Sequence, residues 1–218
     1  MSTEYLVPHS QEPYTIVYQD EHLLLVNKPH LLLSVPGKHP LNKECLISRL
    51  QDHFPTAKVV HRLDLDTSGI MVIALTAPCH AALSRQFRLR QVAKSYIAVI
   101  RGHIEPRQGV IDLPIAADWD NRPRQKICHK TGKPSVTRYR TIDQGPDTSR
   151  LLLHPLTGRS HQLRLHLRAL GHPILGCDLY ADPDTLARSD RLLLHALRLG
   201  FRHPITGLWI SEESPCPF

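Results

Sequence analysis

The stretch "HRLDLDTSGIMVIALT", His61–Thr76, joins a charged loop to the most continuous apolar run of the chain. Residues 69–76, "GIMVIALT", have the length of a strand and no polar interruption before the final threonine, which is typical of a strand buried on both faces. The ten residues from His61 to Ile70 carry a histidine, an arginine, two aspartates and a Thr-Ser-Gly turn. A carboxylate on a loop directly before a buried strand is costly unless it is paired or used. The stretch therefore predicts a central strand with a candidate functional loop at its start.

Strand patterns outnumber helix patterns in the rest of the chain. Runs rich in β-branched, aromatic and leucine residues, separated by Gly, Pro or Asp turns, predict strands. They are residues 14–28, with a turn at 19–21 and Pro29 at the end, and residues 94–102, 135–142 and 149–156. Apolar residues at helical spacing predict helices within residues 44–54 and 80–90. The polar segment 118–133 is expected to be a long exposed loop.

The segment "GRSHQLRLHLRALGHP" fits both a strand and a helix. Three leucines alternate with polar residues in strict period two, which favours a strand. Ser160 is a plausible N-cap, and Gly171 followed by a proline is a plausible helix stop, so we predict a short helix from about Ser160 to Leu170. In either structure Arg164 and Arg168 share a face.

The composition favours a nucleic-acid partner. The chain of 218 residues has 27 Lys+Arg against 20 Asp+Glu, a net charge of +7, which is the sign that phosphate backbones attract. Five cysteines are widely scattered without a Cys-x-x-Cys pair, a pattern that indicates neither a disulfide framework nor a zinc ribbon. His161 and His166 lack the glutamate of a His-Glu-x-x-His helix, so we expect no metal site.

The expected location is the cytoplasm, with no membrane partner. The first residues show no basic-then-apolar signal pattern, and no apolar run approaches the length of about eighteen residues needed for a membrane span. Scattered cysteines agree with a reducing compartment.

Five motifs, in order along the chain, resemble the RluA family of pseudouridine synthases. They are "VNKPHLLLSVPG", "HRLDLDTSGI", "KSYIAVIRG", "TGRSHQLRLHLRALGHPILG" and "RLLLHALRLGFRHP". The resemblance extends from about Tyr14 to Pro204, and five collinear motifs are far more specific than the His-Arg-Leu-Asp tetrapeptide alone. It implies an RNA-modifying isomerase that needs no cofactor and no metal.

The resemblance also implies roles for single residues. Asp64 matches the family's catalytic aspartate, and Arg164 matches the basic residue that pairs with that aspartate. Tyr96 matches the tyrosine that packs on the target base. Arg62 matches the arginine that occupies the space left by the flipped nucleotide.

The residue types suit this chemistry without reference to the family. Uridine isomerisation oxidises and reduces nothing, so a nucleophilic or charge-stabilising carboxylate suffices. The target base must leave the helical stack, at a cost of a few kcal/mol, which Arg62 could offset by filling the gap and Tyr96 by stacking. A cation at Arg164 would favour the ionised carboxylate of Asp64.

Two other functions remain open from the residues. A non-catalytic RNA-binding protein would use the same basic surface without requiring Asp64. A nucleoside or glycoside hydrolase would need a second positioned carboxylate, for which Asp66 is the candidate; we interpret Asp66 as a supporting or solvated residue. Where the family commonly has Gly-Asp after "GHPIL", this chain reads Gly176-Cys177-Asp178, so we assign no role to Asp178.

We therefore predict an α+β fold: a single domain with a mixed, largely antiparallel central sheet flanked by helices and loops, around a central RNA-binding cleft as the resemblance implies. Residues 1–13 are expected to be an N-terminal extension and residues 14–218 the catalytic domain. The expected partners are structured RNA, namely ribosomal or transfer RNA stem-loops. We expect a monomer without an obligate protein partner.

Overall fold

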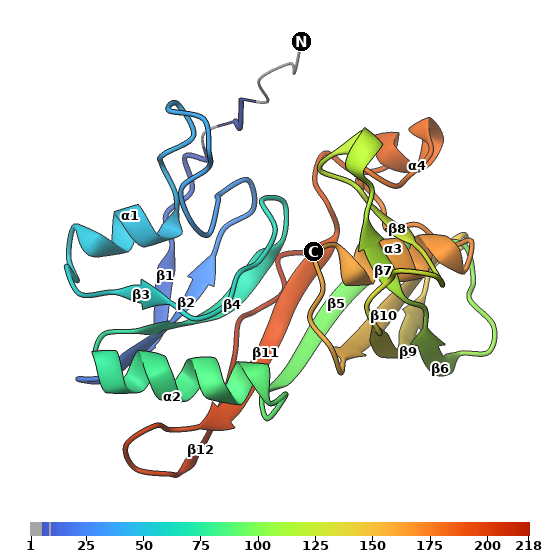
Figure 1. Ribbon diagram of the computed structural model, residues 1–218. Helices are drawn as coiled ribbons and strands as arrows, with labels where there is room; N and C mark the ends of the chain where they lie inside the picture. The colour runs from blue at the N-terminus through green and yellow to red at the C-terminus, as the bar shows by residue number, and fades with distance from the viewer. Residues whose placement is uncertain (1–5, 9) are drawn as a thin grey trace. The chain divides into compact units, whose positions relative to one another are not determined.

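The computed structural model describes residues 6–8 and 10–218, which form two compact units (Figure 1). The first unit comprises the chain up to Lys94 together with Ala196–Pro217, and the second comprises Ser95–His195 and Phe218. The chain leaves the first unit within strand β5 (Ala93–Arg101) and returns to it within strand β11 (Leu194–Arg202).

The first unit is built on strands in the order β1-β2-β4-β11, of which β1 with β2 and β2 with β4 pair antiparallel. Its hairpin confirms the predicted turn near residues 19–21, and β2 ends directly before Pro29. All seven residues of β4 are buried, as the apolar run predicts. Two short strands extend the sheet, because β3 pairs with β4 and β12 pairs with β11. The strands are β1 (Thr15–Gln19), β2 (Leu23–Lys28), β3 (Lys58–Val59), β4 (Ser68–Ala74) and β12 (Trp209–Glu213).

Both helices of the first unit confirm predicted helices, with different bounds. Helix α1 spans Leu46–Gln51 within the predicted segment 44–54. Helix α2 spans Ala77–Arg88 and begins three residues before the predicted start at 80, because Pro78 suits the first turn of a helix. Leu83 of α2 packs in one cluster with alternate residues of β2 and β4, so burial of one face of the sheet fixes this helix.

The second unit contains an antiparallel sheet with the order β5-β10-β9-β6. Three of these strands confirm predictions, while β6 was not predicted. The bounds are β6 (Gln108–Asp112), β9 (Val136–Gln144) and β10 (Thr148–Pro155).

The prediction of a long loop at residues 118–133 is wrong in part. Strand β8 (Gln125–Ile127) pairs with β7 (Ile115–Ala117), and a short 3-10 helix, Trp119–Asn121, lies between them. The segment forms a hairpin with many exposed residues. Three-residue strands on an exposed hairpin carry too little periodicity to be recognised in the sequence.

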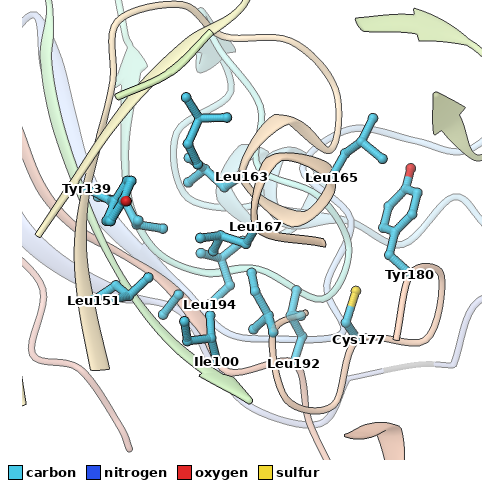
Figure 2. Close-up of a cluster of buried hydrophobic side chains, with 14 of the residues drawn as sticks. Ile100, Tyr139, Leu151, Leu163, Leu165, Leu167, Cys177, Tyr180, Leu192 and Leu194 are labelled. Carbon is cyan, nitrogen blue, oxygen red and sulfur yellow. The ribbon is translucent and has the colours of Figure 1, made fainter. Parts of the chain in front are cut away.

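Helix α3 (Gln162–Ala169) settles the strand-or-helix question of its segment in favour of the helix. Gly171 has a φ of +84° directly after its last turn, which is the expected helix stop. The predicted N-cap at Ser160 is wrong: the cap is His161, whose backbone is left-handed with a φ of 54°. The helix is buried on nearly all sides, since every residue from Gln162 to Leu167 is buried, and Figure 2 shows Leu163 and Leu165 on different sides of it.

The α+β class with a largely antiparallel sheet is confirmed, and the remaining helix is α4 (Pro183–Ala187). The domain bounds 1–13 and 14–218 stay a prediction, and residues 1–5 and 9 of the proposed extension lie outside the described residues. In the described part of the chain, no helix is both long enough and apolar enough to cross a membrane.

Candidate active site

The loop that carries Asp64 is anchored on both sides of that residue. Lys28, at the end of β2, is fully buried and donates to the backbone carbonyl of Leu65 at 3.2 Å. The same ammonium donates to the carbonyls of Pro29 at 2.9 Å and Leu32 at 2.7 Å. A buried cation that binds three carbonyl oxygens compensates part of its desolvation cost. Lys28 therefore ties the Asp64 loop to the end of a central strand.

Ser34 holds the other neighbour of Asp64. Its hydroxyl donates to the carbonyl of Leu63 at 2.8 Å and accepts from the amide of Leu63 at 3.1 Å. The amide of Thr67 then donates to the Asp64 carbonyl at 3.2 Å, which closes a turn before β4. The backbone around Asp64 is thus fixed by groups that do not involve its carboxylate.

Ser34→Ala is expected to lower turnover as well as stability. It leaves the buried amide and carbonyl of Leu63 without their partner, at about 1–3 kcal/mol for each unsatisfied group, and it frees the backbone next to Asp64. The measurements are thermal unfolding and isomerisation kinetics on an RNA substrate.

Ser48→Ala is the matched control for this substitution. Ser48 of α1 makes the same pair of hydrogen bonds with the backbone of Cys45, the N-cap of that helix, at 3.0 and 2.9 Å. Both variants should lose stability, and only Ser34→Ala should lose kcat. Equal kcat in the two variants would show that Ser34 does not position the loop.

Gly69 is the second residue of β4 and lies where two backbones meet. Its φ is +119°, and a Cβ at this position would lie 2.3 Å from the backbone oxygen of Ala196 in β11. No side chain fits there without moving backbone. The glycine of the Thr-Ser-Gly turn therefore allows β11 to approach the strand that follows the Asp64 loop.

His61 begins the loop as a neutral, structural histidine. Its Nε2 accepts a hydrogen bond from the Val72 amide of β4 at 3.1 Å, and its ring stacks on Phe87 of α2 at 4.5 Å between centroids. Burial, reinforced by the positive charge of Lys94, lowers the pKa of His61 to about 3. The histidine of the His-Arg-Leu-Asp motif therefore joins the loop to the sheet and to α2.

Protonation of His61 should destabilise the fold as pH falls. The unfolded chain takes up this proton near an ordinary pKa of about 6.5, whereas the folded chain resists it until about 3. Between these values stability should fall with decreasing pH, by up to about 1.4 kcal/mol per pH unit. Urea unfolding of wild type and His61→Gln at several pH values measures the difference. His53→Gln, at an exposed histidine, is the control; a wild type whose pH profile parallels that of His61→Gln would contradict this expectation.

The predicted RNA-contacting residues of this loop differ in exposure. Arg62 is exposed, as a residue that enters RNA must be, whereas Asp64 and Asp66 are partly buried. Arg62 and Asp64 belong to the first unit, and Tyr96 and Arg164 to the second. The ion pair of Asp64 with Arg164 that the resemblance implies therefore stays a prediction.

Arg164 is buried in the second unit among polar partners. Its side chain on α3 is 1% exposed, forms an ion pair with Asp178 and donates from Nε to the Cys177 sulfur at 3.3 Å. Its guanidinium carbon also lies 5.5 Å from the centre of the Tyr180 ring. Asp178, one position later than the aspartate of the family pattern, thus contacts the arginine, and Cys177 before it adds a second contact.

Tyr180 organises the start of α3. Its hydroxyl hydrogen-bonds to Nδ1 of His161 at 2.7 Å and accepts from the Gln125 amide at 2.8 Å. Its carbonyl accepts from Nε of Arg168 at 3.1 Å. Three basic residues therefore contact this one tyrosine, namely the N-cap His161 and, within α3, Arg164 and Arg168.

Tyr96 lies in β5, partly buried and packed against the apolar core that α3 covers. Its cross-strand neighbour is Leu153, a fully buried residue of that core. Tyr96 is therefore on the α3 side of the sheet, the same side to which α3 contributes Arg164.

An exposed basic hairpin was missed by the search for site residues. Trp119 is 70% exposed, and the guanidinium of Arg122 stacks 3.8 Å above its ring. Exposed cationic residues follow in the same hairpin, namely Arg124, Lys126, Lys130 and Lys133. An exposed aromatic ring among cations is typical of surfaces that bind single-stranded nucleic acid.

Sequence reasoning also missed Lys28, Ser34 and Tyr180, although the first two stand in a motif that carries the resemblance. Their role depends on contacts between residues far apart in the chain. Among the residues that the structure describes, no three His, Cys, Asp or Glu residues are grouped to hold a metal ion.

Comparisons with known proteins agree on one family. The model of the RNA pseudouridylate synthase family matches residues 22–169. The dual-specificity RNA pseudouridine synthase RluA of Escherichia coli (strain K12) is 49% identical over 210 residues, 95% of this chain and 96% of that protein. The enzyme of the same name from Yersinia pestis is 52% identical over 193 residues, 88% of this chain and 94% of that protein.

A solved structure supports the fold. Human RNA Pseudouridylate Synthase Domain Containing 1 superposes with a TM-score of 0.82 at 33% identity, over 98% of this chain and 87% of that one. The predicted pseudouridine synthase fold and the resemblance to the RluA family are thereby confirmed. The chain belongs to the RNA pseudouridylate synthase family, whose members isomerise uridine of RNA to pseudouridine.

Proposed function

We propose that Asp64 is the catalytic carboxylate of this RNA pseudouridine synthase and that its target is a loop uridine in a compact stem-loop. The observation that carries the proposal is the anchoring of Leu63 and Leu65 by Ser34 and Lys28. A carboxylate held between two fixed residues loses little conformational freedom when substrate binds, which favours catalysis.

The reaction requires no other chemical participant. The N1–C1′ bond of uridine breaks, the uracil turns, and a C5–C1′ bond forms. C5 loses its proton and N1, which carries none in uridine, gains one, so atoms and electrons balance. Asp64 acts as a nucleophile or stabilises the positive charge that develops as the glycosidic bond breaks.

In this proposal the other site residues assist the reaction of Asp64 with the target uridine. Arg164 pairs with Asp64 and favours its ionised form. Tyr96 stacks on the target base, and Arg62 fills the gap that the base leaves in the RNA, which offsets part of the cost of unstacking. The exposure of Arg62 and the placement of Tyr96 on the α3 side of the sheet support these roles.

The proposed substrates are a loop of the large-subunit (23S) ribosomal RNA and the anticodon stem-loop of transfer RNA. Two classes of RNA agree with the dual specificity in the names of the relatives. Phosphate contacts from a chain of net charge +7 would supply most of the affinity, and Trp119 with Arg122 would suit an unpaired base. We further propose that the enzyme acts as a monomer, without protein partner or cofactor, in the cytoplasm.

Synthetic hairpins of the two loops test the substrate proposal. At saturating RNA a loop uridine in each hairpin should be isomerised as fast as in the full-length RNA, because a short loop contains what the site reads. The readout is site-resolved pseudouridine after quenched time points. Inert hairpins beside active ribosomal subunits would contradict the compact-substrate proposal, even with Asp64 catalytic.

A further inference from the structure

The sheet of the second unit has a second face, on which arginines alternate with the core residues. In β9 Thr137, Tyr139 and Thr141 are buried, whereas Arg138 and Arg140 between them are exposed. Tyr139 belongs to the core that α3 covers, as Figure 2 shows. Since successive side chains of a strand point to opposite faces, Arg138 and Arg140 lie on the face away from α3.

The strand register places each of these arginines between one cross-strand neighbour on β6 and one on β10. Arg138 lies between Val110 of β6 and His154 of β10, and Arg140 between Gln108 and Leu152. The two arginines are about 7 Å apart along the strand. We call this surface the outer face: Arg138 and Arg140 with Val110, Leu152 and His154.

No protein group neutralises the two central arginines. Within residues 6–8 and 10–218, the side chain of neither Arg138 nor Arg140 takes part in a hydrogen bond or an ion pair. Arg150 of β10 adds a third cation, whose guanidinium carbon lies 5.7 Å from the Phe218 ring. Two exposed carboxylates border the face, Asp112 after Val110 and Asp143 opposite Arg150.

We propose that the outer face binds the phosphate backbone of the RNA substrate, outside the loop that carries the target uridine. Arginines without protein partners form bidentate contacts with phosphates, and the chain acts on RNA. The inference rests on the proposed position of the target base beside Tyr96. Tyr96 is on the α3 side, so the RNA at the outer face is a different segment of the same molecule.

The open edge of the sheet gives this segment a path. Strand β6 is the last strand in the order β5-β10-β9-β6, and Val110 on it is 61% exposed. A strand or stem that leaves the target loop can pass this edge to reach Arg138 and Arg140. We therefore expect a whole transfer RNA, and not an isolated anticodon stem-loop, to contact both faces.

The double variant Arg138→Gln/Arg140→Gln tests the proposal against the control Arg85→Gln/Arg88→Gln. The control removes two exposed arginines from α2 and gives the same change in charge. Kd is measured by filter binding over a range of salt for a whole transfer RNA transcript and for its isolated anticodon stem-loop. Single-turnover isomerisation at saturating RNA is measured in parallel.

We expect Kd for the whole transcript to rise about 10-fold in the outer-face variant, and its log-log salt slope to become shallower by about 1.4 for two lost phosphate contacts. Kd for the isolated stem-loop and the saturated rate should not change. Equal effects on both RNAs, or effects no larger than in the control, would overturn the proposal. The proposal would also be overturned if the outer-face variant bound RNA as wild type does but lost binding to anionic phospholipid vesicles. The Kd of the transcript is measured without turnover. Failure of the catalytic proposal would therefore show in the isomerisation assay alone and not in Kd.

Discussion

Asp64→Asn is expected to abolish isomerisation while leaving RNA binding and folding intact. Turnover should fall by about 10⁴-fold or more, the scale seen when a group essential to the chemistry is removed. The fold should persist because Ser34, Lys28 and Thr67 hold the loop through backbone atoms. Affinity should persist because it comes mainly from phosphate contacts.

Asp66→Asn is the matched control, with the same change in charge two residues away. It should retain most of the turnover of wild type. Single-turnover assays and filter binding on the same RNA measure both variants. A folded Asp66→Asn that is as inactive as Asp64→Asn would favour a paired-carboxylate mechanism, and appreciable product from Asp64→Asn would contradict the assigned role of Asp64.

Arg164→Met is expected to lower turnover by about 10²-fold or more, the effect of removing one preorganised electrostatic group from an active site. Its effect on stability should be modest. Methionine fills much of the same buried space, and the partner that it leaves, Asp178, is 46% exposed and can be solvated.

Asp178→Asn should have the opposite effects: a clear loss of stability and a smaller loss of turnover. Here the buried cation stays and loses its carboxylate, which should cost about 1–3 kcal/mol of unfolding free energy. Turnover should fall less than in Arg164→Met, since the guanidinium remains. Chemical denaturation and kinetics of both variants provide the comparison; unchanged turnover in Arg164→Met would make Arg164 a structural arginine and Arg168 the next candidate.

Local patterns were sufficient where the fold depends on local chemistry. The apolar run of β4 and the glycine stop of α3 predicted both elements. The N-cap of α3 was wrong because His161 adopts a left-handed backbone with its ring on Tyr180, nineteen residues further along the chain. Segment 118–133 was misread because its short exposed strands leave no periodic signal.

The site could be predicted only as far as single residues match a motif. Asp64 and Arg62 stand in one recognisable loop. The anchoring of that loop could not be predicted, because Lys28 and Ser34 contact it across 37 and 29 residues of chain. The role of Asp178 stayed open until the structure showed its ion pair with Arg164, because the sequence alone does not tell which side chain faces the buried arginine.

The most direct test of the central claim, that Asp64 isomerises uridine, is nucleoside analysis of RNA after incubation with the purified protein and with Asp64→Asn. The wild type should yield pseudouridine, an isomer of unchanged mass, with no free uracil, and the variant should yield neither. Free uracil from the wild type would identify a hydrolase. Bound but unmodified RNA would identify a binding protein without catalysis, and either result would contradict the account.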